Sequence, residues 1–231
     1  MKSTTAKRPL LAGVIDALEA AYGPPRRPPT VDPWESILRV NVVYLADDES
    51  REAAFRALRK EVGTRPRDIL QASPLKLQRI SGLAGILAEN SARKVRQAAE
   101  IAETEFGGNL RQVLEWPVPK AKRALKKFPG IGDPGAEKLL MMAGRLPVLA
   151  LESNGLRSLV RLGFAPETGS YSATYRTAQR NAMKEAPSDA GWLVKAHQLL
   201  RRHGQETCKN SKPLCRECVL NRACPYPAKP S

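Results

Sequence analysis

The chain's four cysteines all lie in one short stretch, and their chemistry and spacing are typical of a metal centre. They are Cys208, Cys215, Cys218 and Cys224, separated by six, two and five residues. Thiols this close together are kept ionised by a bound cation, because its field lowers their pKa. Four thiolates are ligands for tetrahedral zinc or for an iron–sulfur cluster. Structural zinc usually takes two Cys-x-x-Cys pairs, and only Cys215 and Cys218 form one here, so the spacing favours a 4Fe-4S cluster.

Two disulfides are the alternative use of these cysteines, and they would require an oxidising compartment. The N-terminal residues Lys2, Lys7 and Arg8 precede an apolar run, as in a secretory signal. Asp16 and Glu19 interrupt that run, so we do not expect export. We predict a cytoplasmic, nucleoid-associated protein with reduced thiols.

The composition favours a polyanionic partner. The 231 residues contain 38 Lys and Arg against 23 Asp and Glu, a formal charge of +15. Such an excess attracts nucleic acid first and an anionic membrane surface second. The sequence has no apolar stretch long enough to span a bilayer, so we expect no membrane partner.

Hydrophobic periodicity predicts an all-α protein. Apolar residues recur every three to four positions from Leu10 to Tyr22, which is the spacing of one helix face. A second helix should begin at Asp32 as N-cap, with Pro33 at the first position and Glu35 completing a capping box. Further helical patterns cover residues 51–62, 67–71, 75–80, 91–106, 110–115 and 120–127.

Residues 119–144 read as a helix, a glycine hairpin and a second helix. Gly130 and Gly132 permit backbone geometry that other residues avoid, with Ile131 between them. The hairpin can therefore aim backbone N–H groups outward, beside the positive end of the following helix. We predict that Gly130, Ile131 and Gly132 bind a DNA phosphate.

Basic residues just before the hairpin would strengthen this contact through charge neutralisation, above all Lys126 and Lys127. The alternative is a structural helix hairpin whose basic face is simply solvated.

Three segments together resemble one known family. They are FPGIGDPGA at residues 128–136, LALESNGLRSLVRLGF at 149–164, and HGQETC at 203–208, which leads into the cysteine stretch. Their order and spacing are similar to those of the endonuclease III group of helix-hairpin-helix (HhH-GPD) DNA glycosylases, from about Asp32 to Cys224.

The resemblance implies a two-lobed fold that grips DNA between its lobes. Residues 29–146 would form a six-helix barrel with the hairpin, and residues 1–28 and 147–231 an iron–sulfur lobe. A damaged base would be flipped out of double-stranded DNA into a pocket. The 4Fe-4S cluster would support a basic loop at residues 209–214, in which Lys209 and Lys212 contact DNA. We expect a monomer bound to damaged or abasic duplex.

One catalytic position of the family, in the first helix turn after the hairpin, carries a different residue in this sequence. Bifunctional members carry a lysine there whose amine forms a Schiff base with the sugar. Pro134 stands at the matching position and has no nucleophile, which disfavours lyase activity. Lys138 lies one turn later on the same face, and a nucleophilic role for it is the minor alternative.

The family's catalytic aspartate matches Glu152. A carboxylate is retained on a longer arm, and it could still stabilise a cationic sugar. Because glutamate is a poor helix cap, we expect Ser153 to cap the next helix. The alternative is that Glu152 is an ordinary acid with no catalytic part.

Two further family positions lie on the second predicted helix and just after it. The glutamate that adenine-excising members carry there matches Val40, which disfavours adenine excision. The glutamine that fills the space of a flipped base matches Leu45, which could act as an apolar wedge. We assign neither His197 nor His203 to catalysis.

The sequence thus predicts a DNA-repair protein that, if active, is a monofunctional glycosylase leaving an abasic site without strand cleavage. A non-catalytic binder of damaged, abasic or distorted DNA is the alternative. A third interpretation is an electron-transfer protein built around the cluster.

Overall fold

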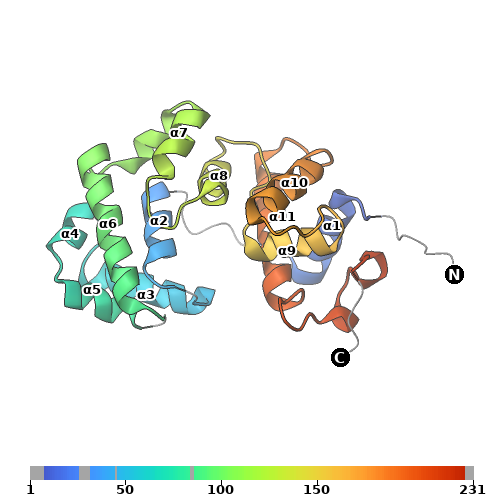
Figure 1. Ribbon diagram of the computed structural model, residues 1–231, viewed down its shortest axis with the longest axis horizontal. Coiled ribbons are helices and arrows are strands. Elements are labelled where there is room, and N and C mark those ends of the chain that lie inside the picture. The colour runs from blue at the N-terminus through green and yellow to red at the C-terminus, as the bar shows by residue number, and fades with distance from the viewer. Residues whose placement is uncertain (1–7, 26–31, 45, 84–85, 227–231) are drawn as a thin grey trace. The chain divides into compact units, whose positions relative to one another are not determined.

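The computed structural model describes residues 8–25, 32–44, 46–83 and 86–226, and these are helical with no strand (Figure 1). The only pairing of extended backbone among them is an isolated bridge between Tyr44 and Ile86. The all-α prediction is therefore confirmed. None of the described helices is both long enough and apolar enough to cross a bilayer.

The chain divides into two compact units, which we describe separately. One unit contains Met1–Arg27 and Leu146–Ser231, and the other contains Pro28–Arg145. The assignment of residues 29–146 to a six-helix barrel, and of 1–28 and 147–231 to an iron–sulfur lobe, stays a prediction.

The unit formed by Pro28–Arg145 is built around its longest helix. Its helices are α2 (Pro33–Asn41), α3 (Asp48–Glu61), α4 (Pro66–Gln71), α5 (Pro74–Ser81), α6 (Ala88–Phe106), the 3₁₀ helix η1 (Leu110–Glu115), α7 (Val118–Leu125) and α8 (Asp133–Met142). α2, α4 and α5 pack against α6. The contact face of α6 carries the buried residues Val95, Ala98, Ala99 and Ala102, and small side chains of this kind let helices approach closely.

The start of α2 has some, but not all, of the local capping features predicted from the sequence. Asp32 is the N-cap and its carboxylate accepts a hydrogen bond from Trp34 N, with Pro33 at the first position, as predicted. The predicted capping box is wrong. Glu35 turns away from the helix start and pairs with Arg59 of α3 at 2.9 Å. An ion pair to a neighbouring helix thus replaced the local contact.

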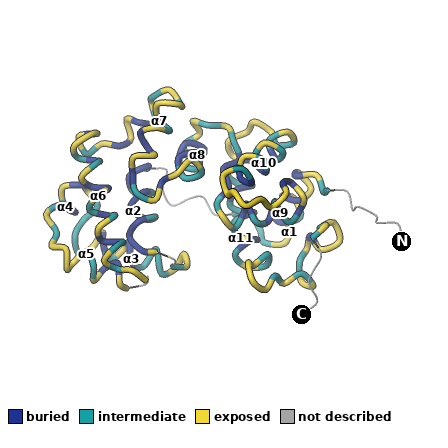
Figure 2. Tube along the Cα trace, in the orientation of Figure 1, coloured by how far each residue is buried: buried dark blue, intermediate teal, exposed yellow. Residues whose placement is uncertain are grey.

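The other unit contains α1 (Leu11–Tyr22), α9 (Ser153–Arg161), α10 (Tyr171–Met183), α11 (Ala190–Glu206) and the short 3₁₀ helices η2 (Cys215–Glu217) and η3 (Asn221–Ala223). α11 packs along α9 on one side and against α1 on another. In Figure 2 these helices alternate between buried and exposed stretches, as amphipathic helices do.

α9 and α11 approach each other closely because a glycine stands at their contact. A Cβ at Gly204 would lie 2.6 Å from the carbonyl carbon and 2.7 Å from the Cβ of Asn154. No residue larger than glycine fits there without moving backbone. This contact holds the start of α9, with Glu152, beside the residues that lead into the cysteine stretch.

Candidate functional site

The glycine hairpin joins α7 to α8 and is anchored by buried apolar side chains. Phe128 and Ile131 are both buried, and Ile131 N donates to Phe128 O at 3.2 Å. Gly130 and Gly132 are exposed, and Gly130 has φ of +75°, which strongly favours glycine. No side chain caps α8 at Gly132. Ile131 therefore holds the hairpin from inside, whereas the two glycines present backbone to solvent.

The lysines near the hairpin are paired with acids of their own unit. Lys126 Nζ lies 2.9 Å from Asp133 Oδ1, in the first turn of α8. Lys127 forms an ion pair with Glu105 of α6. Both lysines are exposed, so these pairs are weak in water and can open. A phosphate at the hairpin would have to compete with Asp133 for Lys126, and this ion pair was not predicted from the sequence.

Pro134 is half-buried at the second position of α8, where its missing N–H costs no helical hydrogen bond. Its position explains why proline is tolerated, and its ring offers no amine. Lys138 follows one turn later in the same helix and is also half-buried.

Glu152 is the N-cap of α9. Its Oε1 accepts a hydrogen bond from Gly155 N at 2.6 Å, and its Oε2 accepts one from Asn154 Nδ2 at 2.8 Å. The expectation that Ser153 caps this helix is wrong, because the longer arm of glutamate folds back far enough to reach the third N–H itself. These bonds fix the carboxylate at the positive end of α9, which suits a negative charge.

A chain of hydrogen bonds links Glu152 to the first cysteine. Asn154, which donates to Glu152, accepts from Arg157 Nη2 at 2.8 Å. Arg157 also donates to Gly204 O at 2.6 Å and, through Nε, to Cys208 O at 2.9 Å. The carboxylate and the start of the cysteine stretch are thus held by the same helix.

The four cysteines line one cavity. It is enclosed by residues of α9, the end of α11 and residues 213–226, including Cys208, Cys215, Cys218 and Cys224. All four are free thiols. Arg161 Nη1 lies 3.4 Å from Cys208 Sγ, and Leu220 N donates to Cys218 Sγ at 3.4 Å. The cavity therefore supplies hydrogen-bond donors to the sulfurs, a feature that tunes Fe–S centres.

As the side chains stand, no three Cys, His, Asp or Glu residues of the described chain are grouped closely enough to hold a metal ion. Burial is the largest cause raising the pKa of Cys218 and of Cys224, and the neighbouring thiols raise it further. A bound cation would offset this burial effect. The donor set thus fits a four-thiolate centre in chemistry, whereas its coordination geometry is not formed.

The predicted DNA-contacting loop runs from this cavity. Lys209 and Lys212 are exposed. The backbone of the loop is held by Arg161, which donates to Lys209 O at 2.7 Å and to Asn210 O at 3.0 Å. Arg157 and Arg161 were not predicted as supports of this loop, although their positions one turn apart on α9 were a signal.

A second cavity, of about 310 Å³, opens in the same unit beside the start of α9. Ser153, Arg157, Glu167 and Tyr171 are among the residues that line it. Burial, followed by the charge of Glu152, raises the pKa of the Tyr171 phenol. The charge of Glu152 is therefore felt at Tyr171 in this cavity, and the place of Glu167 in its wall was not predicted.

Both histidines serve the fold of this unit. His203 is buried, and burial lowers its pKa to about 4. Its Nδ1 lies 2.9 Å from the hydroxyl of Tyr22 in α1. His197 is also buried, with Nδ1 2.7 Å from Ala150 O. Both histidines are thus held in buried hydrogen bonds, and we assign neither to catalysis.

In the Pro28–Arg145 unit, a group of exposed apolar residues was missed. Ile86 and Leu87 are each 59% exposed. Leu83, three residues before Ile86, and Tyr44, which forms the isolated bridge with Ile86, are exposed as well. Leu87 has φ of +59°, which is unusual for a residue with a side chain. Leu45, the predicted wedge, lies outside the described residues.

Comparisons with known proteins agree with these features. No family model matches the chain. Endonuclease III of Sulfolobus acidocaldarius is 26% identical over 197 residues, which cover 84% of this chain and 82% of the relative. Endonuclease III of Thermotoga maritima is 25% identical over 202 residues, 87% of each.

Solved structures agree in fold. A trapped endonuclease III–DNA covalent intermediate gives a TM-score of 0.73 at 20% identity, covering 93% of both chains. A thermostable thymine-DNA glycosylase gives 0.69 at 15% identity, covering 94% of this chain and 95% of the other. The fold and the glycine hairpin define a helix-hairpin-helix protein with the HhH-GPD glycosylase fold. Within that class, the chain is similar in sequence to endonuclease III over most of its length.

Proposed function

We propose that the chain is a DNA glycosylase of base-excision repair that removes a damaged base from double-stranded DNA by hydrolysis and does not cut the strand. The relatives named above support the glycosylase class. Two observations together support the hydrolytic mechanism. A carboxylate, Glu152, is held at the start of α9, and Pro134 provides no amine that could attack the sugar.

Glu152 would stabilise the sugar cation that forms as the base leaves. In this reaction the C1′–N bond breaks, the base departs with the electron pair, and a water oxygen bonds to C1′ while its proton passes to the base. A fixed carboxylate lowers the barrier because it needs no reorganisation as positive charge develops. The bonds from Gly155 N and Asn154 Nδ2 supply that fixation.

The family's lyase reaction needs an amine that attacks C1′, and proline cannot provide it. Lys138 is the nearest lysine along α8, and we assign it no nucleophilic role.

DNA would be held through the backbone of Gly130 and Gly132, with Lys126 and Lys127, and through the loop with Lys209 and Lys212. The exposed Ile86 and Leu87 are apolar side chains suited to fill the gap left by a flipped base, a role first predicted for Leu45.

The cysteine cavity would hold a 4Fe-4S cluster through Cys208, Cys215, Cys218 and Cys224. When bound, the cluster supplies a rigid support for the loop at residues 209–214. Metal analysis of the purified protein tests this proposal. About four irons per chain with a brown colour support it, and a colourless protein with one zinc contradicts it.

The decisive experiment is a panel of duplexes, each with one altered base, incubated with the protein and then treated with alkali. Alkali-dependent strand cleavage at one lesion, without cleavage before alkali, supports a monofunctional glycosylase. Borohydride should trap no covalent adduct. The Glu152→Gln variant should keep its duplex affinity and lose excision by about a hundredfold or more. Trapping by the wild-type protein would show that another amine replaces the family lysine.

A non-catalytic binder of abasic or distorted DNA is the second candidate, and one observation favours it. Both carboxylate oxygens of Glu152 are already used, by Gly155 N and Asn154 Nδ2, for capping α9. A protein that binds abasic duplex tightly yet releases no base from the full panel would be this binder.

A further inference from the structure

Asn41 is a buried polar residue where the helix pattern calls for an apolar one. It is the last residue of α2 and only 3% exposed. Its Nδ2 donates to Ile37 O, one turn earlier, at 2.9 Å. The same nitrogen donates to Pro129 O at 2.9 Å, across 88 residues of sequence. A buried amide costs free energy unless it is bonded, and this one spends its second bond on the glycine hairpin.

The hairpin also packs directly on the end of α2. A Cβ at Gly130 would lie 3.2 Å from Asn41 Oδ1 and 3.4 Å from Val40 Cγ1. The backbone at Gly130 therefore lies close to the last turn of α2.

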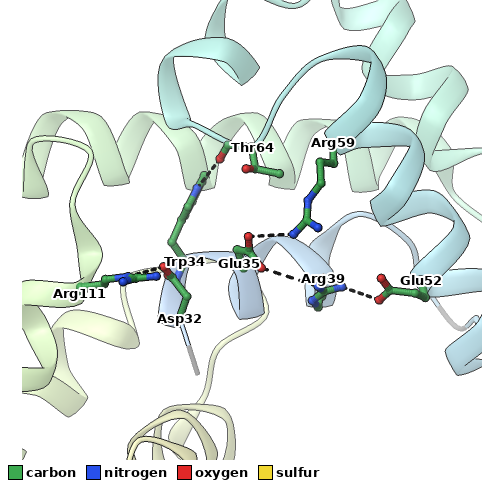
Figure 3. Close-up of polar contacts among 8 residues, drawn as sticks. All are labelled: Asp32, Trp34, Glu35, Arg39, Glu52, Arg59, Thr64 and Arg111. Atoms are coloured by element: carbon green, nitrogen blue, oxygen red, sulfur yellow. Dashed lines mark hydrogen bonds and ion pairs between the residues drawn. The ribbon is translucent and has the colours of Figure 1, made fainter. Parts of the chain in front are cut away.

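The start of α2 is itself fixed by contacts with neighbouring segments (Figure 3). Near its start, Asp32 pairs with Arg111 of η1 at 2.7 Å, and Trp34 Nε1 donates to Thr64 O at 2.6 Å. Also in its first turn, Glu35 pairs with Arg59 of α3. These contacts come from three separate segments, so α2 is a rigid base for the hairpin.

Arg39 strengthens the same attachment. It pairs with Glu35 and with Glu52, and its guanidinium lies 3.7 Å from the centre of the Phe55 ring. A half-buried cation stacked on an aromatic ring contributes more than an exposed ion pair does.

We propose that Asn41 is a positioning residue that orients the DNA-binding backbone of the hairpin. The carbonyl of Pro129 and the N–H of Gly130 belong to one peptide unit. That unit is planar and trans, so its C=O and N–H point in opposite directions. Because Asn41 holds the carbonyl toward α2, the Gly130 N–H points away from α2, where a phosphate can accept it.

This inference rests on the proposed function, since it assumes that the hairpin binds DNA. It adds a residue outside the hairpin that controls how well the hairpin binds. Asn41 touches no DNA in this scheme and acts only through the Pro129–Gly130 peptide.

The test compares Asn41→Leu with Asn41→Ala and with a matched control. Leucine fills a similar volume without a donor, and alanine leaves space for a water molecule. The control is Asn181→Leu, because Asn181 Nδ2 also donates to a distant carbonyl, Phe164 O, at 2.8 Å in the other unit. All four proteins are titrated with duplex over a salt series, and their thermal unfolding is recorded.

Both Asn41 variants should bind duplex about tenfold more weakly than wild type. This is the loss expected when one hydrogen bond to a charged group, here from the Gly130 N–H to a DNA phosphate, is no longer made. The slope of log affinity against log salt should stay unchanged, because no Lys or Arg contact is removed. Asn181→Leu should lower the melting temperature without changing duplex affinity. Affinity that falls equally in the control, or that survives in both Asn41 variants, would overturn the inference.

Amide hydrogen exchange separates this failure from a failure of the proposed function, because it needs no DNA. The Ile131 amide, bonded to Phe128 O, should exchange faster in Asn41→Leu than in wild type. Faster exchange in a protein that binds no duplex at all would refute the DNA-binding function and leave the positioning contact standing. Unchanged exchange would refute the contact.

Discussion

Arg157 should be the most important single side chain for holding the cysteine stretch to α9. Its guanidinium makes three hydrogen bonds, to Cys208 O at 2.9 Å, Gly204 O at 2.6 Å and Asn154 Oδ1 at 2.8 Å. Arg157→Met keeps the length of the arm and removes every donor. Two backbone carbonyls and an amide oxygen then lose their partner in a half-buried place.

The expected cost follows from those bonds. Hydrogen bonds to a charged group contribute about 1.5–3 kcal/mol each, and partial exposure puts these toward the low end. Allowing for packing that methionine retains, we expect the free energy of unfolding to fall by about 3 kcal/mol. For a chain of this size that lowers the melting temperature by roughly 6–12 °C.

Scanning calorimetry measures this shift, with Arg176→Met as control, because Arg176 is exposed on α10. Limited trypsin digestion gives a second, local measurement, since Lys209 is an exposed cleavage site directly after Cys208. Cleavage there should be faster in Arg157→Met. A melting temperature equal to that of the control, with unchanged cleavage, would refute the role assigned to Arg157.

Three further outcomes are expected. Asp133→Asn frees Lys126 from its ion pair and removes a negative charge beside the hairpin, so duplex affinity should rise several-fold. The slope of log affinity against log salt should become steeper by about 0.9, and an unchanged slope in fluorescence anisotropy would contradict this. Ile86→Ser should weaken binding to abasic duplex more than to intact duplex, and equal losses in the same assay would exclude a wedge. Gly204→Ala should lower the free energy of unfolding by about 3 kcal/mol because its methyl group meets α9 backbone, whereas Gly13→Ala, with nothing within 4 Å, should raise it by about 0.5–1 kcal/mol in urea titrations.

Local sequence signals predicted the helices well where the deciding contacts are close in the chain. Asp32 and Pro33 start α2 as expected, because an N-cap and a first-turn proline act over three or four residues. The all-α class followed from periodicity in the same way. Residues 110–115 form a 3₁₀ helix where a helix was predicted, since periodicity does not separate the two at this length.

Long-range partners could not be predicted, and they decided what several side chains do. Glu35 pairs with Arg59 where a capping box was expected, and Lys127 pairs with Glu105. Each outcome depends on which helices become neighbours.

The sequence by itself determined the elements and the reactive groups: helices from periodicity, a glycine hairpin from spacing, four clustered thiols, and a proline where an amine would be needed. These depend on residue type and on contacts within a few positions. Only the tertiary structure decided how the groups are held, since Asn41 reaches Pro129, and Arg157 reaches Cys208, once distant segments have packed together. A hydrogen bond acts over about 3 Å, so its partner is fixed by the fold and not by distance along the chain.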